Sequence, residues 1–301
     1  MATRYFGQPI KRNEDPRLLR GRGLYVDDVQ LPGMLHVAIL RSPHARARIR
    51  RIDTGRAASA PGVVAVVTHQ DLDPRIQGPL PPLIPHPTLK HHKTQFTLAP
   101  GQVRHAGEAV AAVVAESRYA AEDAVDLIEV EYEPLPAVAD MEAALAEDAP
   151  LVHEDIGTNV AAHYTQVVGD VERAFAEADL IFEERFHPDR GAAQPMETRG
   201  VAAVYDRNLG TLTVWDSTQA PIRIRAGLAE LFGMRVHQLR VIAPDVGGGF
   251  GPKIMMFYPE EVLIPWLAMH LGRPVKYIED RREHFYATNQ ERDQIHEVQV
   301  A

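Results

Sequence analysis

The stretch VIAPDVGGGFGPK, residues 241–253, holds four glycines within the five positions 247–251. A run rich in β-branched and apolar residues leads into it, which predicts a strand that ends at the glycine cluster. Glycine loses more conformational freedom on folding than any other residue, so the cluster costs stability unless bare backbone is needed there. The sequence therefore indicates a special use of backbone beside one aromatic ring, Phe250, and one ammonium group, Lys253.

A glycine-rich turn after a strand can be a tight structural bend, a nucleotide-binding loop, or a place where backbone N–H groups approach a bulky anionic cofactor. A phosphate-binding loop needs Gly-Lys followed by Ser or Thr, but here Pro252 precedes the lysine and Ile254 follows it. A dinucleotide-binding loop needs a glycine where Pro252 stands. The residues exclude both nucleotide loops and favour the cofactor over the simple bend, with Phe250 as a wall of the site.

Composition narrows the class of protein. The 301 residues are 45% hydrophobic and 24% charged, as in a globular protein with room for two domains. The net charge of −9 argues against nucleic-acid binding by phosphate neutralisation. Without cysteine, the chain offers no thiolate for disulfides, zinc or iron–sulfur clusters. No apolar run reaches the roughly 20 residues of a membrane span, and no secretory signal opens the chain, so we expect a cytoplasmic protein.

The first part of the chain predicts one compact α+β domain over residues 18–137. Residues 76–101 carry six prolines and predict a long surface loop. Its histidines, His86, His91 and His92, indicate an exposed loop rather than a metal site. The regular elements expected here are strands at 34–40, 46–52, 62–72, 108–116 and 129–138, and a helix at 117–128 capped by Ser117.

The second part predicts a connector at residues 138–168 and a second unit at 169–301. The alternating residues 180–187 predict a strand that a sheet would half bury. No closing helix follows the last strand signal, so we expect a fragment or a fold completed by another chain. The further expected elements are short helices at 141–148 and 171–179, a hairpin of strands at 200–206 and 211–217, helices at 220–233 and 259–272, and strands at 237–246, at 273–280 and from 296.

Several ordered motifs carry a resemblance. With STQAP (217–221) and PMETRG (195–200), the glycine stretch resembles the large subunit of the xanthine dehydrogenase, aldehyde oxidase and carbon monoxide dehydrogenase family. Residues 12–49, 103–117 and 130–136 resemble the α/β hammerhead domain of that family. The resemblance implies an α+β hammerhead domain over 18–137, the connector, and the first part of a molybdenum-cofactor-binding domain over 169–301.

The resemblance also implies a chemistry. Members of the family hydroxylate carbon centres, or oxidise carbon monoxide, at a molybdenum held by a pterin dithiolene. We therefore expect a molybdenum–molybdopterin cofactor in its cytosine dinucleotide form, whose own sulfurs hold the metal, so no residue of the chain ligates it directly. Water would supply the oxygen, and electrons would pass to iron–sulfur clusters and FAD in partner subunits. The expected substrate is an aldehyde, an N-heterocycle or a similar small molecule; the alternatives are a non-catalytic scaffold or cofactor-delivery subunit, or a truncated large subunit.

Three residues match positions around the metal in the family. Gln219 matches the glutamine that hydrogen-bonds the apical oxygen ligand of the metal. Phe250 and Gly251 match the residues whose ring and backbone amide face the metal site. Gly248 and Gly249 would let the backbone close around the cofactor.

The remaining candidates are more open. Lys253 either contacts a phosphate or the pterin, or is solvated. Glu197 lies in the segment near the substrate funnel, or simply pairs with Arg199; beside it, Thr198 stands where the family often has proline. Ile254 occupies the position at which purine-oxidising relatives place a substrate-binding glutamate, and an isoleucine cannot hydrogen-bond a purine.

Two features of the family have no match in this sequence. The general base is a glutamate in a Gly-Glu motif several hundred residues downstream, so we expect a C-terminal molybdopterin-binding chain or segment as a partner. Glu260 and Glu261 are interpreted instead as the first turn of a helix, where the dipole favours them. The cysteine-containing loop of carbon monoxide dehydrogenases also has no counterpart in these residues, which therefore do not support carbon monoxide as substrate; a C-terminal half is the alternative source of such a loop.

Overall fold

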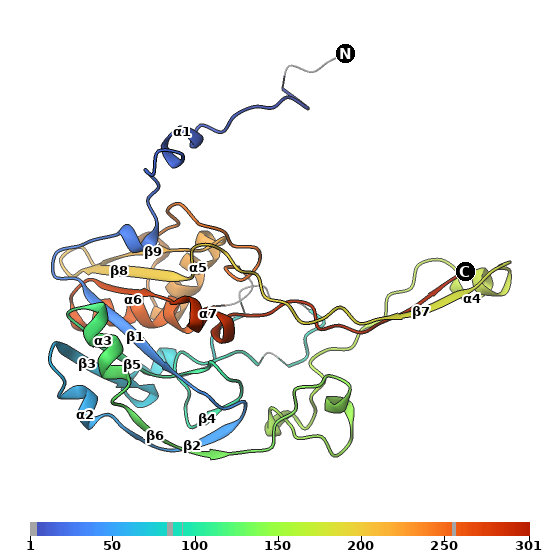
Figure 1. The fold of residues 1–301 in the computed structure, drawn as a ribbon, viewed down its shortest axis with the longest axis horizontal. Helices are drawn as coiled ribbons and strands as arrows, with labels where there is room; N and C mark the ends of the chain where they lie inside the picture. The colour runs from blue at the N-terminus through green and yellow to red at the C-terminus, as the bar shows by residue number, and fades with distance from the viewer. Residues whose placement is uncertain (1–4, 83–86, 92, 255–256) are drawn as a thin grey trace.

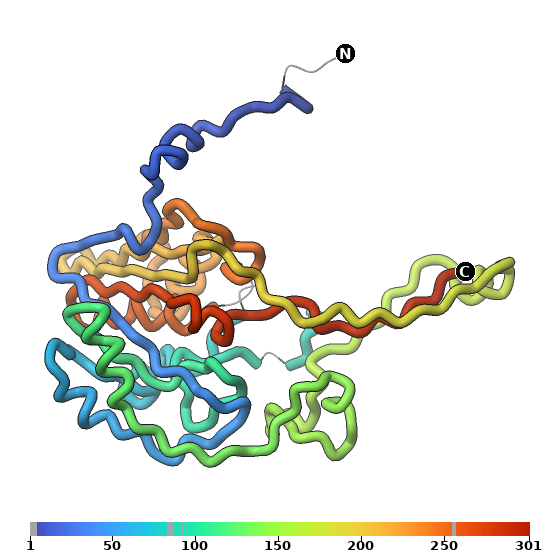
Figure 2. Tube along the Cα trace, viewed as in Figure 1, coloured from blue at the N-terminus to red at the C-terminus, as the bar shows by residue number. Residues whose placement is uncertain are grey.

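The computed structural model describes residues 5–82, 87–91, 93–254 and 257–301. A mixed α/β body carries two projections, an N-terminal segment that contains helix α1 (Asp15–Leu18) and a long arm (Figures 1 and 2). The expected α+β class is confirmed. No helix within the described residues is long and apolar enough to cross a membrane.

One seven-stranded sheet runs through the body in the order β10-β9-β8-β11-β1-β5-β3. Strand β1 pairs in parallel with β11, with Leu35 opposite Val275, and β9 pairs in parallel with β10. The pairing of β1 with β11 joins strands from the two halves of the chain in a single sheet. The strands are β1 (Leu35–Arg41), β3 (Val63–Thr68), β5 (Ala109–Ala115), β8 (Gly200–Asp206), β9 (Thr211–Asp216), β10 (Leu239–Ile242) and β11 (Val275–Ile278).

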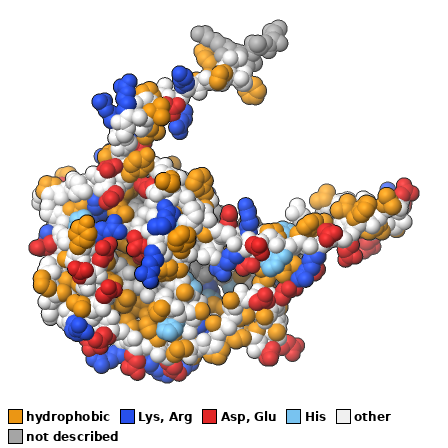
Figure 3. Space-filling view, viewed as in Figure 1, with side chains coloured by type: hydrophobic (Ala, Val, Ile, Leu, Met, Phe, Trp, Pro, Cys, Tyr) orange, Lys and Arg blue, Asp and Glu red, His pale blue; other side chains and the backbone are white. Residues whose placement is uncertain are grey.

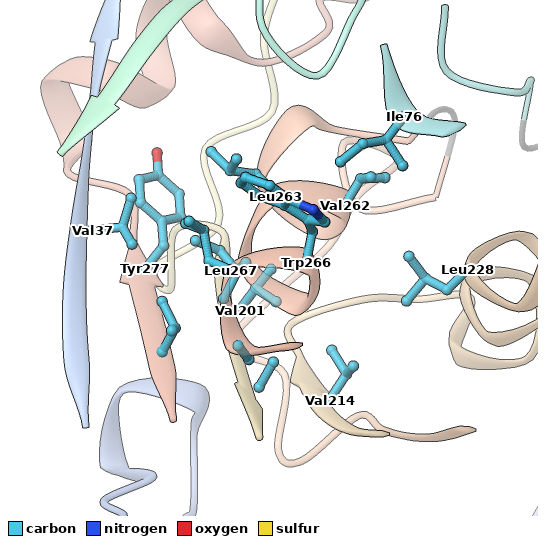
Figure 4. Close-up of a cluster of buried hydrophobic side chains, with 14 of the residues drawn as sticks. Val37, Ile76, Val201, Val214, Leu228, Val262, Leu263, Trp266, Leu267 and Tyr277 are labelled. Carbon is cyan, nitrogen blue, oxygen red and sulfur yellow. The ribbon is translucent and has the colours of Figure 1, made fainter. Parts of the chain in front are cut away.

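Helices cover both faces of this sheet. Strand β5 is buried along its whole length, and its alternate residues enter different clusters, Ala112 and Val114 on one face and Ala111 and Val113 on the other. Helices α5 (Pro221–Phe232) and α6 (Pro259–Leu271) belong to the first face, and α2 (Gly55–Ala58) and α3 (Arg118–Val125) to the second. The main core therefore lies between α6 and the sheet, as Figure 4 shows for Leu263, Trp266 and Leu267 beside Tyr277.

Local sequence explains these helices. Helix α6 begins with Pro259 at its first turn and ends at Gly272, which adopts φ 65°. Its first turn holds Glu260 and Glu261, as predicted. Ser117 caps α3 by accepting from the backbone N–H of Ala120, also as predicted. A short helix, α7 (Arg281–Ala287), follows β11.

A second, three-stranded sheet has the order β4-β2-β6, with β2 (Ala47–Asp53), β4 (Gln102–Val103) and β6 (Glu129–Pro134). The loop at 76–101 between the two sheets is irregular, as predicted, but it does not lie wholly at the surface. Leu80 and Leu98 are 2% and 0% exposed and join the main core. His86 and His92 lie outside the described residues, and His91 is half-buried.

The arm is a two-stranded ribbon of β7 (Phe182–Phe186) and β12 (His296–Val300), preceded by helix α4 (Val171–Ala176) (Figure 1). Every residue of both strands is exposed, so the expectation that a sheet half buries residues 180–187 is wrong. The reason is that β7 pairs only with β12, and the ribbon projects away from the body with neither face covered. Phe182 and Val300 are consequently exposed, and hydrophobic side chains lie along the surface of the arm (Figure 3).

The expected helix at 141–148 is also wrong. Only a 3-10 turn, Ala143–Leu145, forms there. Most of this segment is exposed, and a short helix without a packed face is marginal in water.

Candidate functional site

Lys253 is buried at the end of the glycine cluster. Its side chain is 0% exposed, and its Nζ lies 3.1 Å from Glu197 Oε2. The ammonium also donates to Ser217 Oγ at 2.7 Å and to the backbone oxygen of Glu197 at 3.1 Å. Burial lowers the pKa of Lys253, and the neighbouring Glu197 opposes that shift. The solvated alternative for Lys253 is therefore wrong, since the three donors of its ammonium have three protein acceptors.

Glu197 links this lysine to the glycine cluster. Its Oε2 accepts from Ser217 Oγ and from the backbone N–H of Gly247, each at 2.7 Å. The backbones also pair, with Glu197 N donating to Gly247 O at 3.1 Å. A Cβ on Gly247 would lie 2.5 Å from Glu197 Cβ, so only glycine allows this approach. We call Glu197, Ser217, Gly247 and Lys253 the Glu197 clasp; it fastens together the three segments that carry the cofactor-domain resemblance.

Glu197 does not pair with Arg199, so that alternative is wrong. Arg199 turns to the other side of the chain, where its Nε lies 2.8 Å from Glu260 and its Nη2 lies 2.6 Å from Glu279. Its guanidinium also stacks over the ring of Tyr258, 3.6 Å from the centroid. All three charged groups are buried, and pairing them avoids the cost of an isolated buried charge.

Arg41 extends this buried ionic network to the first half of the chain. It stands at the end of β1, pairs with Glu283 of α7, and lies 3.8 Å from Glu260 of α6. Its Nη2 also donates to the hydroxyl of Tyr277 at 3.0 Å. The network therefore ties the end of β1 to helices α6 and α7.

Gln219 is fixed against the glycine loop. Its Oε1 accepts from the backbone N–H of Gly251 at 3.1 Å, and its own N–H donates to Lys253 O at 3.0 Å. A Cβ on Gly249 would lie 2.4 Å from Gln219 Cδ. Within the described part of the chain, the Nε2 of Gln219 has no hydrogen-bond partner, and its side chain is exposed. The loop thus orients the amide and leaves its N–H donors available.

Phe250 and its glycine neighbours shape an open backbone turn. Phe250 adopts φ 53°, a left-handed conformation that is uncommon outside glycine, and it is 70% exposed. Gly248 and Gly251 both have φ 105°, and a Cβ on Gly251 would meet no atom within 4 Å. The N–H groups of Gly248, Gly249 and Phe250 donate to no acceptor among the described residues. An exposed ring beside unpaired N–H donors forms a surface suited to a bulky anionic group.

Ile254 closes the turn. Its N–H donates to Gly251 O at 3.1 Å, and its half-buried side chain packs against the main core. At least part of the Ile254 side chain is therefore used for packing against the core.

Asp216 is a buried carboxyl that the sequence did not single out. It is 2% exposed, and its Oδ2 has no hydrogen-bond partner among the described residues. Burial raises the pKa of Asp216 to about 8, and the nearby charge of Glu260 adds to this while Lys253 opposes it. The group is therefore largely protonated at neutral pH. Glu261 behaves similarly, because burial and then Asp216 raise its pKa well above the usual range. From the sequence alone, a buried aspartate at the end of a strand cannot be distinguished from a solvent-exposed one.

Comparisons with known proteins agree with this arrangement. The family model of the aldehyde oxidase and xanthine dehydrogenase a/b hammerhead domain matches residues 20–136, and that of the molybdopterin cofactor-binding domain matches residues 152–301. The chain belongs to the large-subunit family of xanthine dehydrogenase, aldehyde oxidase and carbon monoxide dehydrogenase. Members of this family are oxidoreductases.

Similar proteins cover almost all of this chain. It is 40% identical over 297 residues to the nicotine 6-hydroxylase large subunit of Paenarthrobacter nicotinovorans, covering 98% of this chain and 36% of that protein. It is also 40% identical to the carbon monoxide dehydrogenase large chain of Afipia carboxidovorans, covering 94% and 36%. The crystal structure of quinoline 2-oxidoreductase from Pseudomonas putida 86 matches with a TM-score of 0.89 and 41% identity, covering 98% and 37%. The chain thus spans little more than a third of the length of these relatives.

The residues present fit a molybdopterin cofactor. The glycine loop offers unpaired N–H groups and open space above Gly251, and Gln219 offers amide donors beside them. Among the described residues, no three His, Asp or Glu side chains converge as a metal-binding group.

Proposed function

We propose that this chain forms one wall of the cofactor site in a molybdenum hydroxylase, with Gln219, Phe250 and Gly251 at the metal. The observation that carries the proposal is the hydrogen bond from Gly251 N to Gln219 Oε1, which leaves the Nε2 amide available at the open side of the turn. A surface glutamine without a function would not require the glycine at 249 that makes room for it.

When bound, the cofactor supplies the oxidation of a substrate carbon, with water as the oxygen source. The residues of this chain bind and orient it. With the cofactor bound, Gln219 Nε2 would be available to donate to it, the N–H groups of Gly248 and Gly249 would bind its anionic groups, and the exposed ring of Phe250 would wall the site. Lys253 would support the site through the Glu197 clasp, because its ammonium already donates to Glu197 and Ser217. The general base and the remaining cofactor contacts belong to a C-terminal molybdopterin-binding partner or segment.

The substrate we propose is an N-heterocycle or an aldehyde. Two similar proteins are named for N-heterocycles, nicotine and quinoline. Ile254 stands where a purine-binding glutamate would be, and its side chain packs against the core, which disfavours xanthine. Carbon monoxide is the second candidate, because a carbon monoxide dehydrogenase large chain is equally similar. This chain has no cysteine for the loop of that activity.

The complex we propose includes iron–sulfur and FAD subunits that carry electrons away, works in the cytoplasm, and uses the cytosine dinucleotide form of the cofactor. Release of cytidine monophosphate on acid hydrolysis of the purified complex would identify that form. Release of guanosine monophosphate, or of no nucleotide, would contradict it.

Turnover of the assembled complex tests the function. Co-expression with a C-terminal partner chain and the two electron-transfer subunits should give dye-linked oxidation of quinoline or benzaldehyde. A non-catalytic scaffold or delivery subunit is the alternative, and Gln219→Ala and Phe250→Ala separate the two. If the chain is catalytic, both variants lower kcat by 10-fold or more while the complex still assembles, since each removes a group at the reacting metal. Unchanged turnover in both would establish the scaffold instead.

A further inference from the structure

A cavity of about 750 Å³ lies away from the glycine loop. Its lining residues come from positions 45–46, 93–96 and 104–108, from 136–153, from Arg190, and from 285–290, a segment that begins within α7. None of its lining residues belongs to the Glu197 clasp or to residues 247–254. It is therefore separate, in the residues that build it, from the site described above.

Six of the side chains that line the cavity are cationic or imidazole groups. They are Arg46, Lys93, Arg104, Arg190, His105 and His153. Burial lowers the pKa of His153, and the nearby charges of Arg104 and Lys93 lower it further. The lining thus gathers four cationic side chains and one carboxylate, Glu108, in a chain whose net charge is −9.

Two of these guanidinium groups have unused donors. Arg46 is 8% exposed, and its Nε is buried without a hydrogen-bond partner among the described residues. The Nε of Arg104 is also buried and unpartnered within the same residues. A buried N–H of a charged group that lacks an acceptor costs stability, so a ligand oxygen that reached it would be bound strongly.

Carboxylates only partly balance these charges. Arg46 Nη2 pairs with Glu154 at 2.6 Å, and Lys93 pairs with Asp155, but both acidic side chains are 66% exposed. Glu108, within the lining, is committed to the backbone, because its Oε2 accepts from Arg104 N at 2.6 Å. The Lys93–Asp155 pair is partly exposed and therefore weak, so an incoming anion can displace Asp155 more readily than Glu154, whose partner Arg46 is buried.

The geometry points to a binding site for a small molecule that carries a phosphate group, seated between Arg46 and Arg104. Four cationic side chains suit a multiply charged phosphate better than a single carboxylate, and the guanidinium fork matches its oxygens. Phe96, Phe285 and Tyr286 line the same cavity and give an apolar surface for the rest of the ligand. The site does not depend on the proposed molybdenum chemistry.

Calorimetric titration of the purified chain with inorganic pyrophosphate and with adenosine monophosphate tests this site. We expect saturable binding that weakens as salt rises, with Arg46→Gln and Arg104→Gln each lowering affinity about 10-fold or more. Arg48→Gln is the matched control, because Arg48 lies on the adjoining strand and pairs at the surface with Glu133. Lys93→Gln is a second test variant that should fold normally, because the Lys93 side chain is 35% exposed. It should also weaken binding.

Absence of binding, or equal affinity in the wild type, Arg46→Gln and Lys93→Gln proteins, would overturn the site. Binding to the chain that disappears in the assembled complex without cofactor would also overturn it, because the cavity would then be a subunit contact. Binding retained in the complex supports the site. If loading with the cofactor then abolishes it, the phosphate belongs to the cofactor; if binding persists, it belongs to a separate small molecule.

Discussion

Lys253 and Glu197 form an ion pair in which Nζ lies 3.1 Å from Oε2, and the lysine side chain is fully buried. The pair connects the end of the glycine loop to the segment that precedes β8, and Ser217 at the end of β9 bonds to both. Gln219 follows Ser217 by two residues and its backbone N–H donates to Lys253 O, so the position of the site glutamine depends directly on the clasp. Loss of the clasp should therefore change both the stability of the chain and the position of Gln219.

Glu197→Gln should destabilise the chain strongly. The substitution keeps the shape of the side chain but leaves the buried ammonium of Lys253 without its counter-charge, a loss of about 3–5 kcal/mol in the free energy of unfolding. Urea denaturation followed by circular dichroism measures it. Glu184→Gln, on the exposed arm, is the control and should stay within about 0.5 kcal/mol of wild type.

The stability of the double variant Glu197→Gln/Lys253→Met tests whether the two side chains stabilise the fold as a pair. Removing both charges should restore part of the stability lost in Glu197→Gln, because no unpaired buried charge remains. Strictly additive losses would show that the two side chains do not act as a pair.

Asp216→Asn should flatten the pH dependence of stability. In the folded protein the pKa of Asp216 is raised to about 8 by burial, so the folded state holds a proton that the unfolded state loses near pH 4. The stability that protonated Asp216 contributes to the fold is fully present below about pH 4 and is lost as pH rises through about 8. The wild type should therefore lose stability relative to Asp216→Asn across this window in thermal unfolding. Parallel pH profiles of the two proteins would refute the assignment.

The N-terminal segment should detach at low pH. Arg17 pairs with Asp245, whose Oδ2 also accepts from the backbone N–H of Leu24 at 2.8 Å. Hydrogen bonds from Arg17 and then from Leu24 lower the pKa of Asp245 to about 2. This stabilisation is present above about pH 4 and is lost as pH falls through about 2.

Amide hydrogen exchange measured by mass spectrometry follows this detachment. Peptides over residues 17–24 should exchange faster as pH falls toward 2, after correction for the intrinsic rate. In Arg17→Ala they should already exchange fast at pH 5. Equal protection in the two proteins at pH 5 would mean that the ion pair does not hold the segment.

Local patterns predicted most elements of the body, because cap residues, prolines and β-branched runs act within a few positions. Ser117, Pro259 and Gly272 mark helix ends where the structure has them. The pairing of β1 with β11 was not predictable, because neither strand carries a signal that names its partner. The exposed ribbon was also missed, since alternation in β7 resembles that of a half-buried strand.

The candidate site, too, was predictable from the sequence only in part. Motif resemblance brought Gln219, Phe250 and the glycines together, and the structure places them in contact. It did not reveal the roles of Glu197 and Lys253, because a lysine is usually solvated and its burial here depends on a distant carboxylate. Asp216 escaped notice for the same reason: only the fold removes it from water.

Molybdenum content tests the central claim most directly. Gly249→Ala places a Cβ 2.4 Å from Gln219 Cδ and should displace that amide from the loop. Gly78→Ala is the control, because a Cβ there meets no atom within 4 Å. Mass-spectrometric metal analysis of the co-expressed complex should find molybdenum equimolar with this chain in the wild type and Gly78→Ala, and at least 10-fold less in Gly249→Ala. A wild-type complex without molybdenum, or a Gly249→Ala complex that retains it in full, would contradict the account.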